Sequence, residues 1–165
     1  MKRFLGLIMM CILLAVMPAG CSAPETSEGT GTSDTADMEN NTEKEIVEMK
    51  MNISSTTVDV DWEDNESVAA LRDLASEKPL TIRMSMYGGF EQVGPIGSDL
   101  PSNDVQTTTS AGDIVLYSGN QIVVFYGSNS WAYTRLGHIT DQDTAGMRDL
   151  LGNGDVTITI SMENK

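Results

Sequence analysis

Residues 113–117 read DIVLY and residues 121–126 read QIVVFY, and Ser118, Gly119 and Asn120 separate the two runs. Both runs are rich in β-branched and aromatic residues, which favour strands, while the three residues between them favour a turn. Two such runs joined by so short a loop predict an antiparallel β-hairpin. Because nearly every position in both runs is apolar, we expect this hairpin to lie at the centre of the fold.

Alternating patterns extend from the hairpin toward both ends of the chain. Apolar and polar residues alternate, as in half-buried strands, over residues 47–53, 58–62, 80–86 and 156–161. The first two of these runs, which are joined by Ser54 and Ser55, predict a second hairpin.

Two segments have helical spacing instead. Residues 64–76 place Val68, Leu71 and Leu74 on one face behind an N-cap at Asp64 or Asn65. Residues 144–152 predict a second short helix that ends at Gly152. Many short strands with two short helices predict a mainly β domain over residues 45–165, in the form of a closed antiparallel β-barrel.

The first 20 residues have the pattern of a secretory signal peptide, with two basic residues, an apolar run over residues 4–17 and small residues before Cys21. The apolar run is shorter than the ~20 residues that span a membrane as a helix. The sequence PAGC at residues 18–21 is similar to a lipobox, although Pro18 stands where an aliphatic residue is usual. We therefore expect cleavage before Cys21 and lipidation of Cys21. The alternative is a secreted protein with a stray thiol.

Residues 21–44 are polar and acidic with almost no apolar side chains, so we expect a disordered tether between the lipidated Cys21 and the domain. This organisation predicts a protein anchored by its lipid to the extracytoplasmic face of the cell membrane. The membrane is thus the first expected partner.

The composition excludes several classes of function. The formal net charge is −14, which excludes nucleic acid as a partner because binding it needs clustered basic residues. Cys11 and Cys21 are the only cysteines, so the domain has no disulfide and no cysteine nucleophile. His138 is the only histidine, and the acidic run at residues 59–64 lacks the glycine and glutamate of a calcium-binding loop. We expect no metal and no cofactor.

Two segments, YGGFEQVG at residues 87–94 and FYGSNSWAYTRLG at residues 125–137, combine aromatic, glycine and polar residues. We predict that both are irregular loops and that a binding site lies between them, since glycine permits close approach and aromatic side chains give stiff contact area. The candidate binding residues are Tyr87, Phe90, Glu91, Phe125, Tyr126, Trp131, Tyr133 and Arg135. The alternative is that the aromatic residues close the barrel ends while Glu91 pairs with Arg135.

The sequence resembles the bacterial cyclophilin-like domain family in two segments that follow each other in the same order. They are MSMYGGFEQVG, which begins at Met84, and the segment from Leu100 to Gly137. The resemblance extends over residues 45–161 and implies a cyclophilin-like barrel with two helices. The Phe-His-Arg segment and the Gln-Gly-Gly-Asp-Phe loop of authentic cyclophilins are absent from this sequence.

These observations lead to three hypotheses about function. The first is a binding module for a peptide or small ligand, without established catalysis. The second is a weak peptidyl-prolyl isomerase of exported proteins, in which Arg135 is the candidate catalytic residue and Phe90, Phe125 and Trp131 hold the proline ring. The third, suggested only by the resemblance, is a partner of a flavodoxin-like redox protein.

Overall fold

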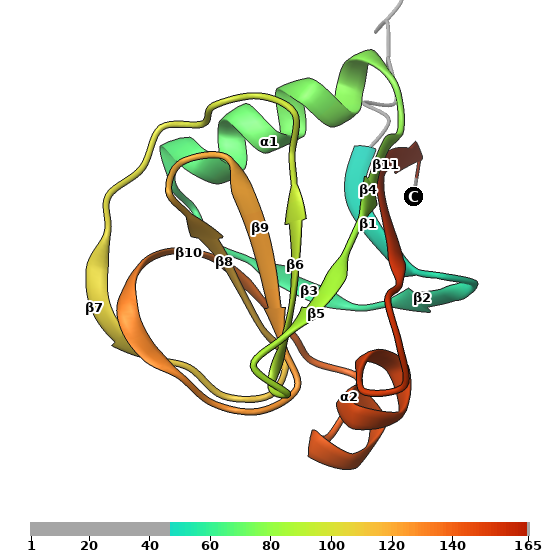
Figure 1. The fold of residues 1–165 in the computed structure, drawn as a ribbon. Helices are drawn as coiled ribbons and strands as arrows, with labels where there is room; N and C mark the ends of the chain where they lie inside the picture. Colours follow the sequence, from blue (N-terminus) through green and yellow to red (C-terminus); the bar gives the residue numbers. More distant parts are fainter. Residues whose placement is uncertain (1–46, 165) are drawn as a thin grey trace, which may run out of the picture. The chain divides into compact units, whose positions relative to one another are not determined.

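The computed structural model describes residues 47–164, so the expected signal peptide, Cys21 and tether lie outside the described residues. Two antiparallel sheets and two helices make up the described part (Figure 1). In chain order the elements are β1 Val47–Ile53, β2 Thr56–Val58, β3 Val60–Trp62, α1 Glu66–Glu77, β4 Leu80–Arg83, β5 Ser85–Tyr87, β6 Glu91–Pro95, β7 Val105–Thr108, β8 Asp113–Tyr117, β9 Gln121–Phe125, β10 Ser130–Ile139, α2 Thr144–Leu151 and β11 Thr157–Asn164.

The predicted central hairpin is confirmed. Strands β8 and β9 pair antiparallel, with Tyr117 opposite Gln121. Ser118 and Gly119 have φ angles of 52° and 75°, and the Asn120 N–H donates to the Tyr117 carbonyl at 3.3 Å. Left-handed φ angles at both central positions give the turn the twist that suits a hairpin, which explains why small and polar residues stand there.

The hairpin lies in the middle of the larger sheet, a seven-stranded sheet of order β3-β10-β8-β9-β6-β5 in which β7 also pairs with β10. The other sheet has four strands in the order β2-β1-β11-β4. The chain passes from one sheet to the other at Asp59, between β2 and β3, and at Met84, between β4 and β5. Each of these points divides a run that the sequence presents as one alternating segment.

The mainly β class, the antiparallel pairing and the two helices are confirmed, whereas the closed barrel is not. Neither sheet closes on itself in the described part: the larger one ends at β3 and β5, which have three residues each. Closure of a barrel requires hydrogen bonds between the two edge strands of one sheet. Here the two sheets meet by side-chain packing, since Ile82 of β4 and Ile114 of β8 belong to the same apolar cluster.

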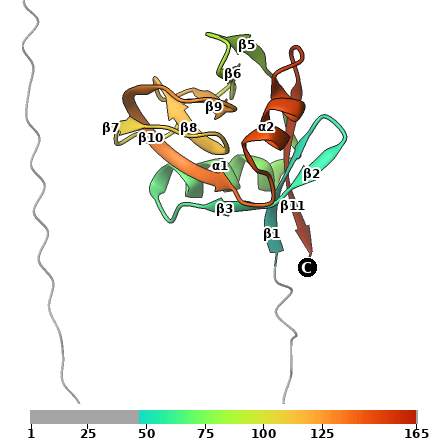
Figure 2. The ribbon, with the colours of Figure 1, turned by 90° about the horizontal axis from the view of Figure 1, so that it is seen from below.

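One large apolar cluster lies between the sheets and the helices. Helix α1 contributes Val68, Leu71 and Ala75, and it packs against β10 and β11, which pass beside it in Figure 2. Its N-cap is Asn65, whose side chain accepts from the Val68 N–H at 3.0 Å. The short helix α2 adds Met147 and Leu151 to the same cluster and has Gly152 as its C-cap, as predicted.

The two segments expected to be irregular loops are largely strands, which corrects that prediction. Gly88 and Gly89, with φ angles of 63° and 75°, form a tight turn from β5 into β6. The second segment contains most of β10, the longest strand described. Glycine, serine and asparagine disfavour strands locally, but pairing with β7, β8 and β3 gives β10 its backbone partners.

In the described part of the chain, no helix is both long and apolar enough to cross a membrane.

Substituting Gly94 with alanine should destabilise the domain, because β6 lies very close to β4 at this position. A Cβ atom at Gly94 would lie 2.4 Å from the Met84 sulfur and 2.8 Å from the Arg83 carbonyl oxygen. We expect urea unfolding to show a loss of about 1–3 kcal/mol, as for other overpacked sites. The exposed loop variant Ser98→Ala should unfold like the wild type. An unchanged midpoint for Gly94→Ala would contradict the close approach of the two strands.

Candidate binding site

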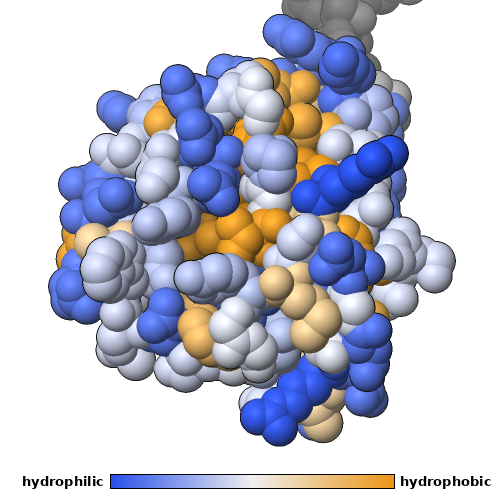
Figure 3. All heavy atoms as spheres, in the orientation of Figure 1, coloured by the Kyte–Doolittle hydropathy of each residue, from blue (hydrophilic) through white to orange (hydrophobic). Residues whose placement is uncertain are grey.

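A pocket of about 320 Å³ opens on the face of the larger sheet that points away from α1. The strands β5, β6, β8, β9 and β10 and the turn before β10 all contribute to it. Figure 3 shows apolar atoms exposed in the middle of this face, over β6 and β9, with hydrophilic residues around them. We call this the aromatic pocket, and it is lined by Tyr87, Glu91, Val93, Tyr117, Gln121, Val123, Asn129, Trp131 and Tyr133.

Strand register explains why these residues meet. Tyr87 pairs with Glu91, and Glu91 pairs with Phe125 on the next strand. Two residues further along β6, Val93 pairs with Val123. Residues directly opposite each other in neighbouring strands point to the same face, so these pairs form rows across one side of the sheet.

The floor of the aromatic pocket is a second, smaller apolar cluster. It contains Val115, Val123, Phe125 and Tyr133, all buried. The Tyr133 ring contacts the Phe125 ring edge to face, with centroids 5.7 Å apart, and the Tyr117 ring at 6.1 Å. These contacts fix the orientation of Tyr133 and give the pocket a stiff base.

The rim is exposed and aromatic. The exposed fraction is 66% for Tyr87, 58% for Trp131 and 37% for Tyr117. Large aromatic side chains left open to solvent around a hollow are typical of binding surfaces, because they give a large contact area at low cost in conformational entropy.

Glu91 is the polar group at the base of this pocket. Its exposed fraction is only 5%, and its Oε2 atom has no hydrogen-bond partner among the described residues. Burial raises the pKa of this carboxyl from 4.5 to about 7. Burial, followed by the nearby charge of Glu91, also raises the pKa of Tyr133, whose hydroxyl accepts a hydrogen bond from Asn129 at 3.0 Å.

The remaining aromatic candidates lie elsewhere. Phe90 is half-buried and packs against the edge of the floor cluster, while Phe125 lies fully buried within it. Tyr126 points to the opposite side of the sheet and belongs to the main apolar cluster. Phe90 and Phe125 therefore support the aromatic pocket from below, and Tyr126 takes no part in it.

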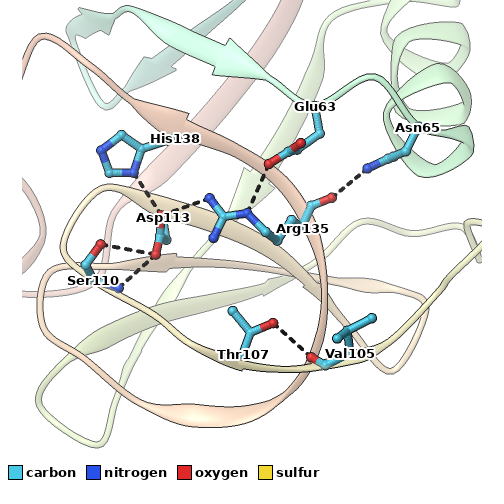
Figure 4. A network of polar contacts seen from close by, with 8 residues as sticks. All are labelled: Glu63, Asn65, Val105, Thr107, Ser110, Asp113, Arg135 and His138. Carbon is cyan, nitrogen blue, oxygen red and sulfur yellow. Dashed lines mark hydrogen bonds and ion pairs between the residues drawn. The ribbon is translucent and has the colours of Figure 1, made fainter.

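Arg135 does not pair with Glu91, which corrects the alternative that joined these two residues. Its Nε atom donates to Glu63 at 3.0 Å and its Nη2 atom to Asp113 at 3.3 Å, while His138 Nδ1 lies 2.8 Å from the same Asp113 oxygen (Figure 4). Burial alone would raise the pKa of Asp113. The hydrogen bonds from Ser110 and His138 and the charge of Arg135 outweigh burial, and they hold this pKa below its usual value.

Arg135 borders a larger hollow of about 690 Å³ along the edge of β10. Several polar groups of this hollow already have partners within the protein. Ser67 donates to the Pro101 carbonyl at 2.6 Å, and Asn65 donates to the Arg135 carbonyl at 2.9 Å. The aromatic pocket differs because its buried carboxyl oxygen has no partner.

Residues 51–161 match the family model described as the cyclophilin-like family. The chain belongs to the cyclophilin-like family. The matched range contains every residue of the aromatic pocket and confirms the resemblance that the sequence suggested. No curated protein and no solved structure matches the chain.

The sequence of this cyclophilin-like domain indicated both walls of the aromatic pocket and two residues of its floor, Phe125 and Tyr133, but not the rest of the floor. The prediction named Tyr87, Glu91, Trp131 and Tyr133, and it omitted Tyr117 and the hairpin residues beside it. A signal was present, because Val115 and Tyr117 alternate with Ile114 and Leu116 along β8, and Val123 alternates with Ile122 and Val124 along β9. Alternation in a run that is apolar throughout means that both faces of the strand are covered.

Within residues 47–164 of the cyclophilin-like domain, no group of three or more histidine, cysteine, aspartate or glutamate side chains could hold a metal ion. The acidic run from Asp59 to Asp64 extends over β3 and the segment before α1.

The raised pKa of Glu91 predicts how the stability of the cyclophilin-like domain depends on pH. A carboxyl whose pKa is higher in the folded state than in the unfolded state binds its proton more tightly when folded, so stability falls as the pH rises from about 4.5 through 7. Glu91→Gln cannot ionise. The variant should match the wild type near pH 4.5 and exceed its stability at pH 8 by up to about 3 kcal/mol, since one pKa unit corresponds to about 1.4 kcal/mol.

Urea unfolding at both pH values measures this difference. Glu77→Gln, at the exposed end of α1, makes the same chemical change without burial and should keep the pH dependence of the wild type. A Glu91→Gln curve that runs parallel to the wild-type curve would show that Glu91 stays ionised without cost.

Proposed function

We propose that this cyclophilin-like domain is a binding module, held at the extracytoplasmic face of the cell membrane, that takes a peptide or small ligand in the aromatic pocket. The observation that carries the proposal is the buried carboxyl of Glu91, which has no hydrogen-bond partner among the described residues and lies at the base of a pocket rimmed by exposed aromatic residues. A buried carboxyl without a partner is rare in folded proteins, and a ligand at its accessible oxygen would supply one.

The dimensions and the chemistry of the pocket support this proposal. Its volume of about 320 Å³ lies at the lower end of the range of small-molecule sites, which are mostly apolar with a few placed polar groups. Its lining residues stand on paired strands, so the ligand would meet a surface that is formed in advance.

The contacts of Arg135 favour binding over isomerisation. Prolyl isomerisation of the kind expected for this fold needs a guanidinium that is free to donate toward the substrate. The Nε and Nη2 atoms of Arg135 donate to Glu63 and Asp113, which hold the guanidinium in place. Arg135 also does not line the aromatic pocket. Among the described residues, we find no contact that favours a flavodoxin-like partner.

The anchoring part of the proposal rests on the sequence before the domain. The signal-peptide pattern, the lipobox-like residues 18–21 and the polar run after Cys21 together support a lipid anchor and a tether. An anchor of this kind would leave the domain outside the cell membrane, where its ligand would be an exported peptide or an external small molecule.

Binding can be tested by titrating the isotope-labelled domain with a library of short peptides and small amphipathic compounds, with NMR amide shifts as the readout. We expect shifts to gather on β5, β6, β9 and the first half of β10. Trp131→Ala should weaken a hit about 10-fold or more, as for an aromatic anchor, with stability within about 0.5 kcal/mol of the wild type.

Val105→Ala is the matched control for this experiment. Val105 has the same exposed fraction as Trp131, 58%, but it lines the larger hollow. Its substitution should leave the hit unchanged. Shifts that gather around Arg135 and are lost in Val105→Ala would place the binding site in the larger hollow instead, and an absence of hits would contradict a binding module.

Anchoring can be tested by fractionating cells that produce the full chain. Cys21→Ala should move the protein from the membrane to the soluble exported fraction, because Cys21 is the expected acceptor of the lipid. Cys11→Ala is the control, since Cys11 would leave with the signal peptide and its loss should keep the protein at the membrane. Retention of Cys21→Ala at the membrane would overturn the lipid anchor.

A further inference from the structure

We infer that the aromatic pocket recognises an alkylammonium cation, such as the side chain of a lysine in a peptide or a free primary amine. The inference rests on the proposed function, because it names the ligand class of the same pocket. It is carried by two features of the same lining: the carboxyl of Glu91, which has no hydrogen-bond partner among the described residues, and the aromatic side chains.

The first step concerns charge. Glu91 is the one acidic residue of the lining, and the lining contains no lysine, arginine or histidine. A carboxylate in this position has no positive partner of its own, and burial without a partner is costly. A bound cation would supply that partner, whereas an anionic ligand would add a second negative charge to the same buried site.

The second step concerns the walls. Tyr87, Tyr117 and Trp131 on β5, β8 and β10, with Tyr133 in the floor, line the same pocket as the carboxyl. Aromatic faces attract cations, and the attraction is largest where the cation has lost its water. An aromatic enclosure with one carboxyl at its base therefore favours a cation with an apolar stem over a neutral apolar group.

The third step concerns shape. Because Oε2 of Glu91 is fully buried, a ligand in the pocket can reach only the other oxygen of the carboxyl, and a single acceptor suits the compact ammonium group. A guanidinium is planar and is matched best by both oxygens of a carboxylate. The formal charge of −14 would also raise the rate at which any cation reaches the domain.

Glu91 is the group through which pH acts on this site. The other titratable side chains that line the pocket are Tyr87 on β5, Tyr117 on β8 and Tyr133 on β10, and β6 and β9 contribute no further one. Burial raises the pKa of Glu91 to about 7, so the carboxyl gains its charge near neutral pH. Ammonium binding should therefore strengthen between pH 5.5 and pH 8, a range over which lysine stays charged.

Calorimetric titration of the domain with three probes tests the inference. The probes are the tripeptide acetyl-Ala-Lys-Ala-amide, its norleucine counterpart, which has no charge, and n-butylammonium chloride. At pH 8 we expect the lysine peptide to bind at least 10-fold more tightly than the norleucine peptide, and to lose about 10-fold in affinity at pH 5.5. Tighter binding of the peptide than of butylammonium would identify a peptide source, and equal binding would identify a free amine.

Glu91→Gln should abolish the preference for lysine over norleucine and the dependence on pH, while Glu77→Gln should keep both. Circular dichroism checks that the variants fold, and the pH profile of the wild type tests the inference without any variant. Equal affinities of the wild type for the two peptides would overturn the recognition of a cation but would leave the proposed binding module intact. Failure of all three probes to bind would also overturn the recognition of a cation. Whether the pocket binds any ligand is decided separately by the titration with the library of peptides and amphipathic compounds.

Discussion

The structure depends on the β8–β9 hairpin being covered on both of its faces. Ile114, Leu116, Ile122 and Val124 point into the main apolar cluster, and Val115, Val123 and Phe125 point to the other side of the sheet. A strand that buries both faces cannot slip by one residue without exchanging two apolar sets, so its register is set by the main cluster and the pocket floor together. The pocket is thus built on the strands whose positions are most strongly fixed.

Much of this arrangement could be predicted from local patterns. The hairpin, the outer strands and both helices follow from periodicity, while the C-cap at Gly152 and an N-cap at Asp64 or Asn65 follow from residue type. Prediction failed where pairing over long distances decides the structure. The glycine- and serine-rich stretch before Arg135 has weak local preference for a strand, yet it pairs with strands that begin at Val105 and Asp113. Local composition does not contain that information.

The same limit applies to the partners of Arg135. Sequence alone offered Glu91 as its partner, whereas Glu63 lies 72 residues away in the chain. The contact of Arg135 with Glu63 is exposed and contributes at most about 1 kcal/mol to stability. The Asp113 carboxylate is largely buried, and it accepts hydrogen bonds from Ser110 and Arg135 and contacts His138. These contacts join the segment before α1 to β8 and β10. Arg135 therefore has a structural explanation that Glu91 does not.

Two buried carboxyls in one sheet thus have opposite surroundings. The pKa of Asp113 is lowered because donors and a guanidinium surround it, and the pKa of Glu91 is raised because burial is not compensated. Stability would favour a neutral side chain at position 91, since a carboxyl without a partner lowers the stability of the folded state above pH 7. Sequences that depart from such local preference do so mostly at functional sites. The cost of keeping a carboxyl at the base of an aromatic pocket is accounted for if a ligand there provides the positive charge that the protein itself does not.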